Sequence, residues 1–133
     1  MAVFDRSELE ASPLADLHAI ANQLGLDGFR RLRKADLIDA ILRAIDNPAA
    51  HRQTFNVCMD EPVDYGALGA YLAASRGLET VPVRTPYHST WLDNAKAKFL
   101  LGWRPRYDLE MMVDAAWSYR RASDDPRKVW YPG

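Results

Sequence analysis

The sequence predicts a small α+β protein that is mostly helical, because apolar residues recur at helical spacing while only two short strand candidates are present. Its 133 residues are 48% hydrophobic and 26% charged, which is the composition of a globular chain. All four tryptophans and all six tyrosines lie beyond residue 60, whereas the aromatic residues of the first 45 positions are Phe4 and Phe29. This break predicts two segments of different origin, residues 1–45 and residues 46–133.

Charge and cysteine content exclude several classes of protein. The formal net charge is −1, so we expect no overall attraction to nucleic acid or to an anionic membrane. Cys58 is the single cysteine and cannot form a disulfide within the chain, which is typical of a reducing cytoplasm. No apolar run approaches the roughly 20 residues of a membrane span, and the N-terminal stretch lacks the apolar core of a signal peptide. We therefore expect a cytoplasmic protein that does not contact membranes.

The first segment predicts two short helices around an extended loop. Ser12 and Pro13 are typical of a helix start, and Gly25 is typical of a helix end. Residues 26–32 form an irregular connection. A second helix begins at about Arg33 and places five apolar residues on one face: Leu37, Ile38, Ile41, Leu42 and Ile45.

The second segment predicts the element order βαβαα. Its strands are residues 54–57 and Thr80–Arg84, the latter at a sheet edge because Pro82 cannot donate a ladder hydrogen bond. Its helices are residues 64–76, which Gly77 ends, residues 94–101, which Asp93 caps and Gly102 ends, and residues 109–121, which Asp108 caps. Two strands are too few for a self-contained parallel sheet.

The first segment resembles the N-terminal domain of transcription termination factor Rho over about residues 7–45. The resemblance rests on the pattern L-x-x-L-x-x-I-A-x-x-L-G from Leu14 and on the run RRLRKADLIDAIL from Arg30. It implies a helix–extended loop–helix module, similar to SAP modules, of a kind that accompanies RNA- or DNA-binding regions. Four basic residues at the loop and the start of the second helix would then meet phosphates: Arg30, Arg31, Arg33 and Lys34. The alternative is a solvated surface, because residues 1–45 carry six basic and seven acidic residues.

Residues from about 46 to the end resemble the C-terminal part of NAD-dependent epimerase/dehydratases, which are extended short-chain dehydrogenases. The resemblance rests on TFNVCMDEPVDYG from Thr54 and on the pattern D-x-x-K-A-x-x-x-L-G-W-x-P from Asp93. It implies a small substrate-binding lobe in which Arg84 and His88 would contact a nucleotide sugar. The alternative is architectural: Asp93 caps a helix, Gly102 ends it and Trp103 seals its underside.

The chemistry of that family is missing. It needs a glycine-rich turn after a Rossmann strand and a Tyr-x-x-x-Lys pair, and no tyrosine of this chain has lysine four residues later. His18, His51 and His88 have no metal-ligand spacing. We therefore expect no catalytic residue, no metal, no cofactor and no complete Rossmann sheet.

The two resemblances overlap in one helix, because Asp36–Ala44 satisfies both patterns. This predicts a fusion by recombination, truncation or deliberate engineering. The first functional hypothesis is a non-catalytic or partner-dependent fragment of a nucleotide-sugar epimerase/dehydratase-like protein. The alternatives are a small nucleic-acid-associated adaptor that uses the basic loop and an engineered chimera without evolved function. The missing sheet also predicts a homodimer, with Leu37–Ile45 and the four apolar strand residues near its interface: Phe55, Val57, Val81 and Val83.

Overall fold

The computed structural model describes residues 5–118, which form six α-helices, one 3₁₀ helix and one pair of strands. The elements in order are α1 (Arg6–Ala11), α2 (Leu14–Gln23), β1 (Leu26–Asp27), α3 (Lys34–Ala44), η1 (Pro48–Ala50), β2 (Phe55–Asn56), α4 (Tyr65–Arg76), α5 (Ala95–Leu101) and α6 (Leu109–Ser118). The strands β1 and β2 pair in parallel, Leu26 opposite Phe55 and Asp27 opposite Asn56. The prediction of a mostly helical α+β fold without a complete Rossmann sheet is confirmed.

The N-terminal helices begin differently from the prediction. Asp5 starts α1 with a capping box, in which its carboxylate accepts the Glu8 N–H at 2.8 Å and the Glu8 side chain accepts the Asp5 N–H. The Ser7 hydroxyl also donates to the Asp5 carboxylate, at 2.6 Å, and this bond together with that from the Glu8 N–H lowers the pKa of Asp5. The prediction that Ser12 caps α2 is wrong. Its N–H donates to the Leu9 carbonyl at the end of α1, and its hydroxyl donates to the Glu8 carbonyl. Pro13 stands at the cap of α2 without a side-chain bond.

The loop after α2 contains a strand that the sequence analysis treated as irregular. Gly25 turns the chain with φ +77°, a conformation that favours glycine. Its carbonyl accepts the Phe55 N–H at 2.9 Å, and the Asp27 carbonyl accepts the Val57 N–H at 2.8 Å. The loop of the first predicted segment therefore pairs with the first predicted strand of the second, which forms at Phe55–Asn56, within the predicted residues 54–57.

One apolar core crosses the predicted boundary at residue 45. The helix α3 contributes three fully buried residues that were predicted, Leu37, Ile38 and Ile41, and two partly buried ones, Leu42 and Ile45. The second segment contributes six residues to the same core: Ala50, Phe55, Val57, Ala97, Leu101 and Trp103. Phe55 and Val57 are therefore buried in a core that they share with the first segment, and the apolar face of α3, which the dimer prediction placed near an interface, is buried within one chain.

Buried hydrogen bonds join the segment after α5 to α3. Trp103 is fully buried, as its architectural interpretation predicted, and its Nε1 donates to the Asp36 carbonyl at 3.0 Å. The Asp36 carboxylate is also fully buried and accepts the backbone N–H groups of Arg106 and Tyr107 at 3.0–3.1 Å. Because a buried carboxylate needs such donors, residues 103–107 and α3 stabilise one another.

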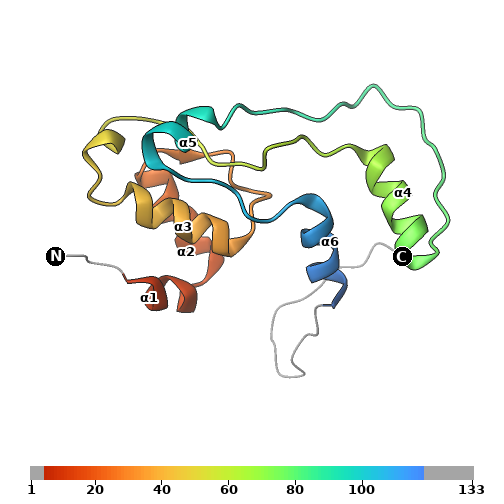
Figure 1. Cartoon of the computed structure of the whole chain (residues 1–133), viewed down its shortest axis with the longest axis horizontal. Coiled ribbons are helices and arrows are strands. Elements are labelled where there is room, and N and C mark those ends of the chain that lie inside the picture. The colour runs from red at the N-terminus through yellow and green to blue at the C-terminus, as the bar shows by residue number, and fades with distance from the viewer. Residues whose placement is uncertain (1–4, 119–133) are drawn as a thin grey trace.

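The helices α4 and α6 stand apart from this core, at the ends of extended segments (Figure 1), and neither contains a buried residue. Asp64 caps α4 on the Ala67 N–H, Gly77 ends it at φ +64°, and Asp108 caps α6 on the Met111 N–H. Asp114 joins the two helices by accepting bonds from Tyr71 and from Arg76. The predicted end of the last helix at Arg121 lies outside the described residues.

The predicted strand Thr80–Arg84 is wrong. These residues are extended without any ladder partner, and the side chains of Val81 and Val83 are 76% and 77% exposed. Their alternation with polar residues satisfied the strand pattern, but no strand formed by residues 5–118 lies beside them to pair with. Within residues 5–118, no helix is long and apolar enough to cross a membrane.

Candidate nucleic-acid interface

The predicted basic loop places Arg30 and Arg31 outward by burying its apolar residues. Phe29 and Leu32 enter the core, and a turn joins them because the Leu32 N–H donates to the Phe29 carbonyl at 2.9 Å. The two arginines between them project into solvent at the edge of β1. This local geometry follows from the sequence F-R-R-L, in which two basic residues stand between two apolar ones.

Lys34 and Arg33 do not share this surface. The Lys34 ammonium donates to the carbonyls of Glu10 and Ser12, at 2.8 and 2.9 Å, which are the last carbonyls of α1 and its cap. Cations stabilise helix C-termini in this way, so Lys34 holds α1 against α3. Arg33 lies over the Tyr107 ring at 5.6 Å. The four basic residues therefore separate into three environments rather than one patch.

Arg31 instead meets two tyrosines from the second segment. Its guanidinium lowers the pKa of Tyr87, because a neighbouring cation favours the phenolate, and the Tyr65 hydroxyl acts in the same direction. The rings of Tyr65 and Tyr87 contact edge to face, with centroids 5.9 Å apart. Both tyrosines are about half exposed, at 52% and 56%.

An open hollow of about 230 Å³ lies between this loop and the segment before α5. Arg30, Arg31, Tyr87 and Trp91 line it, together with two acidic residues, Asp27 and Glu61. Trp91 is 70% exposed, and its Nε1 donates to the Asp60 carbonyl at 3.2 Å, which orients the indole. The hollow thus combines two guanidinium groups with large exposed aromatic rings. Such a combination can stack unpaired bases and pair with their phosphates.

Sequence reasoning missed the aromatic half of this site, because Tyr65, Tyr87 and Trp91 are scattered over 27 positions of the second segment. Their approach to the loop depends on contacts between distant residues. The Asn94 side chain donates to the Cys58 carbonyl at 2.9 Å, and the Cys58 thiol contacts the Leu92 carbonyl at 3.6 Å. The sequence signal was an excess of aromatic residues outside any helical apolar face.

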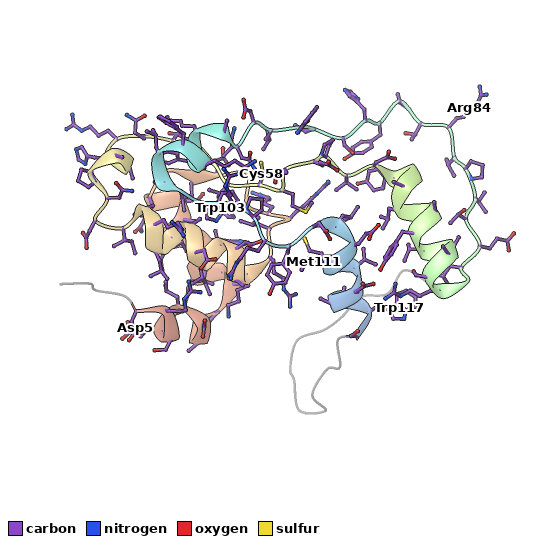
Figure 2. The ribbon with its side chains drawn as sticks, in the orientation of Figure 1. Asp5, Cys58, Arg84, Trp103, Met111 and Trp117 are labelled. Carbon is purple, nitrogen blue, oxygen red and sulfur yellow. The ribbon has the colours of Figure 1, made fainter. Side chains whose placement is uncertain are left out.

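The residues predicted to contact a nucleotide sugar are not brought together with this hollow. Arg84 and His88 are exposed on the extended segment between α4 and α5, and Figure 2 shows Arg84 at its outer edge. The strand that was expected to position Arg84 does not form. Neither residue lines the hollow between Arg31 and Trp91.

Other reactive groups have structural roles. Burial raises the pKa of the Cys58 thiol, so it is a poor nucleophile. The Asp60 carboxylate pairs with Lys98, which lowers its pKa, as does a bond from Asn94. Across the part of the chain that the structure describes, no three His, Cys, Asp or Glu residues are grouped as metal ligands.

Comparison with known proteins supports the first resemblance alone. Residues 8–47 match the family model of the Rho termination factor, N-terminal domain. The matched segment runs from α1 to the end of α3 and includes Arg30, Arg31 and Asp36. No curated protein and no solved structure matches the chain. The chain thus contains a segment similar to the N-terminal domain of the Rho termination factor, and no comparison supports the epimerase/dehydratase resemblance of residues 46–133.

Proposed function

We propose that this protein is a small adaptor that binds single-stranded nucleic acid in the hollow between Arg31 and Trp91. The observation that carries the proposal is the juxtaposition of two exposed arginines from the Rho-like segment with exposed aromatic rings from the rest of the chain. Every base has a flat π-face, so stacking on Tyr87 and Trp91 accepts many sequences. The guanidinium groups of Arg30 and Arg31 attract the phosphates on either side.

The size of the site limits its affinity. Two guanidinium groups that neutralise two phosphates predict a salt dependence of about −1.4 in log K against log of salt concentration for a single strand. Asp27 and Glu61 reduce the local positive charge further. Stacking therefore supplies the larger share, and we expect weak binding that is moderately sensitive to salt. A duplex offers no unstacked bases and binds more weakly than a single strand.

The test is the fluorescence anisotropy of a labelled single-stranded oligonucleotide, titrated with the full chain at low salt. Replacing both rings (Tyr87→Ala with Trp91→Ala) is expected to weaken binding about 30-fold or more, from about 1–3 kcal/mol for each of the two stacked bases. Replacing both cations (Arg30→Ala with Arg31→Ala) flattens the salt dependence. Lys34 is left unchanged because it holds α1.

Two matched controls separate this site from general charge and hydrophobicity. Phe99→Ala removes a ring that is 87% exposed on α5, and Arg84→Ala removes a cation from the outer edge of the extended segment. Both are expected to bind like the unchanged protein. The proposal fails if the unchanged protein does not bind, or if these controls weaken binding as much as the site variants do.

The competing hypothesis is the partner-dependent sugar-nucleotide lobe, with Arg84 and His88 as its contacts. It predicts that a UDP- or GDP-sugar raises the unfolding temperature, and that Arg84→Ala with His88→Ala abolishes this rise. On our proposal no such rise occurs.

A homodimer remains a further prediction, which sedimentation at micromolar concentration tests. Its interface would involve the exposed Val81 and Val83, and the free Cys58 thiol suits a cytoplasmic location.

A further inference from the structure

A second concentration of positive charge lies over the C-terminal half of α3, where the sequence analysis placed no site. Four arginines from three parts of the chain converge there: Arg6 from α1, Arg43 from α3, and Arg104 and Arg106 from the segment after α5. They line an open hollow of about 590 Å³ together with one carboxylate, that of Asp39. The fold rather than the sequence spacing assembles this cluster, because up to 100 positions separate its members.

Asp39 orients two of the guanidinium groups. Arg6 bonds one of its carboxylate oxygens, and the Arg106 Nη2 bonds the other at 2.7 Å. Below them the Arg106 Nε lies 3.6 Å from Asp36, whose carboxylate already accepts backbone N–H groups. At the rim, Glu10 lies 3.9 Å from Arg6 and takes part of its charge. Asp39 thus neutralises one cation of the lining but fixes the direction of two.

The remaining two arginines have no carboxylate partner among residues 5–118. Arg43 extends along Gly102 and donates a long bond, 3.5 Å, to the Leu101 carbonyl. Arg104 is exposed, and its influence on another charge is a weak lowering of the pKa of Asp60. Asp39 thus holds the guanidinium groups of Arg6 and Arg106 in place, while those of Arg43 and Arg104 remain able to pair with a ligand. The hollow therefore presents an excess of positive charge.

We propose that this hollow binds consecutive phosphate groups. The guanidinium fork donates paired hydrogen bonds to phosphate oxygens, and all four cations here are arginine. Four guanidinium groups from three parts of the chain can contact more than one phosphate, so the ligand that we propose is a chain of phosphates. Two sources share this chemistry, the phosphodiester backbone of a nucleic acid and the polyphosphate of a free nucleotide.

The proposal stands apart from the hollow between Arg31 and Trp91. The two hollows have no lining residue in common. Loss of binding at one therefore leaves the other intact, and each proposal can fail alone. If both hold, the chain contacts one strand at two places, with bases at the first and backbone at the second.

The experiment is isothermal titration of the full chain with tripolyphosphate, and in parallel with an unlabelled single-stranded oligonucleotide, at low salt. The test variant is Arg43→Gln with Arg104→Gln, because neither residue holds Asp39 and the fold is retained. The single variant Arg104→Gln is compared with Arg84→Gln, which removes an equal charge from an exposed arginine elsewhere. Circular dichroism confirms that each variant is folded.

We expect the double variant to weaken the binding of at least one probe about tenfold or more, and Arg84→Gln to leave it unchanged. Tripolyphosphate binding that depends on Arg43 and Arg104 identifies a free polyphosphate as a sufficient ligand. Oligonucleotide binding that depends on them, without tripolyphosphate binding, identifies the backbone. The proposal is overturned if neither probe binds saturably, or if Arg84→Gln has the same effect as Arg104→Gln.

Discussion

Replacing Trp103 by alanine tests whether the two predicted segments share one core. The side chain is fully buried, donates to the Asp36 carbonyl and packs with residues of α3, β2 and α5. If residues 1–45 folded independently, the loss of Trp103 would leave α2 untouched. If the core is shared, the same change destabilises both segments together.

The expected magnitude follows from burial. Truncating a buried tryptophan to alanine costs about 3–5 kcal/mol, against a total stability of about 5–15 kcal/mol. With an unfolding entropy of about 2 cal/mol/K per residue over roughly 100 residues, the melting temperature falls by about 15–25 °C. Trp103→Phe keeps most of the packing and loses the hydrogen bond, and it costs about 1–2 kcal/mol.

Thermal and urea unfolding followed by circular dichroism measure these changes, and amide exchange of Leu17 and Ala21 reports on α2. Trp91→Ala is the matched control, because that indole is 70% exposed and its loss changes stability little. The reasoning is refuted if Trp103→Ala costs less than about 1 kcal/mol. It is also refuted if amide protection in α2 survives while residues beyond 46 lose theirs.

Two further predictions concern the turn at Gly25 and the titration of Tyr87. Gly25→Ala is expected to destabilise the fold more than Gly77→Ala, since both have positive φ but the new Cβ would lie 2.3 Å from the Gln53 carbonyl oxygen at Gly25 and in open space at Gly77. Equal losses in urea unfolding would contradict this. Arg31→Ala should raise the pKa of Tyr87 toward its ordinary value, because Arg31 favours the phenolate. Ultraviolet titration of the ring, with Tyr87→Phe to assign the signal, would contradict this if the pKa did not move.

Local signals predicted α2 to α6, because helix ends depend on single residues, but they missed α1, and Ser12 ends α1 rather than capping α2. Asp64, Asp108, Gly77 and Gly102 each act where their side chain or conformational freedom predicted. The apolar face of α3 could likewise be read from its spacing. Helix caps and periodicity lie within a few residues of one another, so they need no knowledge of the rest of the chain.

Contacts between distant residues escaped prediction. The strand β1 is two residues long and exists because Phe55 donates to the Gly25 carbonyl before it and Val57 donates to the Asp27 carbonyl within it. Residues 80–84 alternate apolar and polar side chains more regularly than β1 does, but among residues 5–118 they pair with no strand. In the candidate site, the basic residues were visible as a run, but their separation into Lys34 on α1, Arg33 on Tyr107 and Arg31 beside Tyr87 depends on where other segments pass.

Asp36 shows why function should be examined in the whole chain. It lies in the segment that matches the Rho N-terminal domain, in a run of mostly apolar neighbours, and its carboxylate is fully buried. Its donors are the backbone groups of Arg106 and Tyr107, which the matched segment does not contain. A chain cut after residue 47 would deprive the buried Asp36 carboxylate of these bonds. Both proposed surfaces also draw residues from both sides of that cut, so the Rho-like segment supplies part of each site and the rest of the chain completes it.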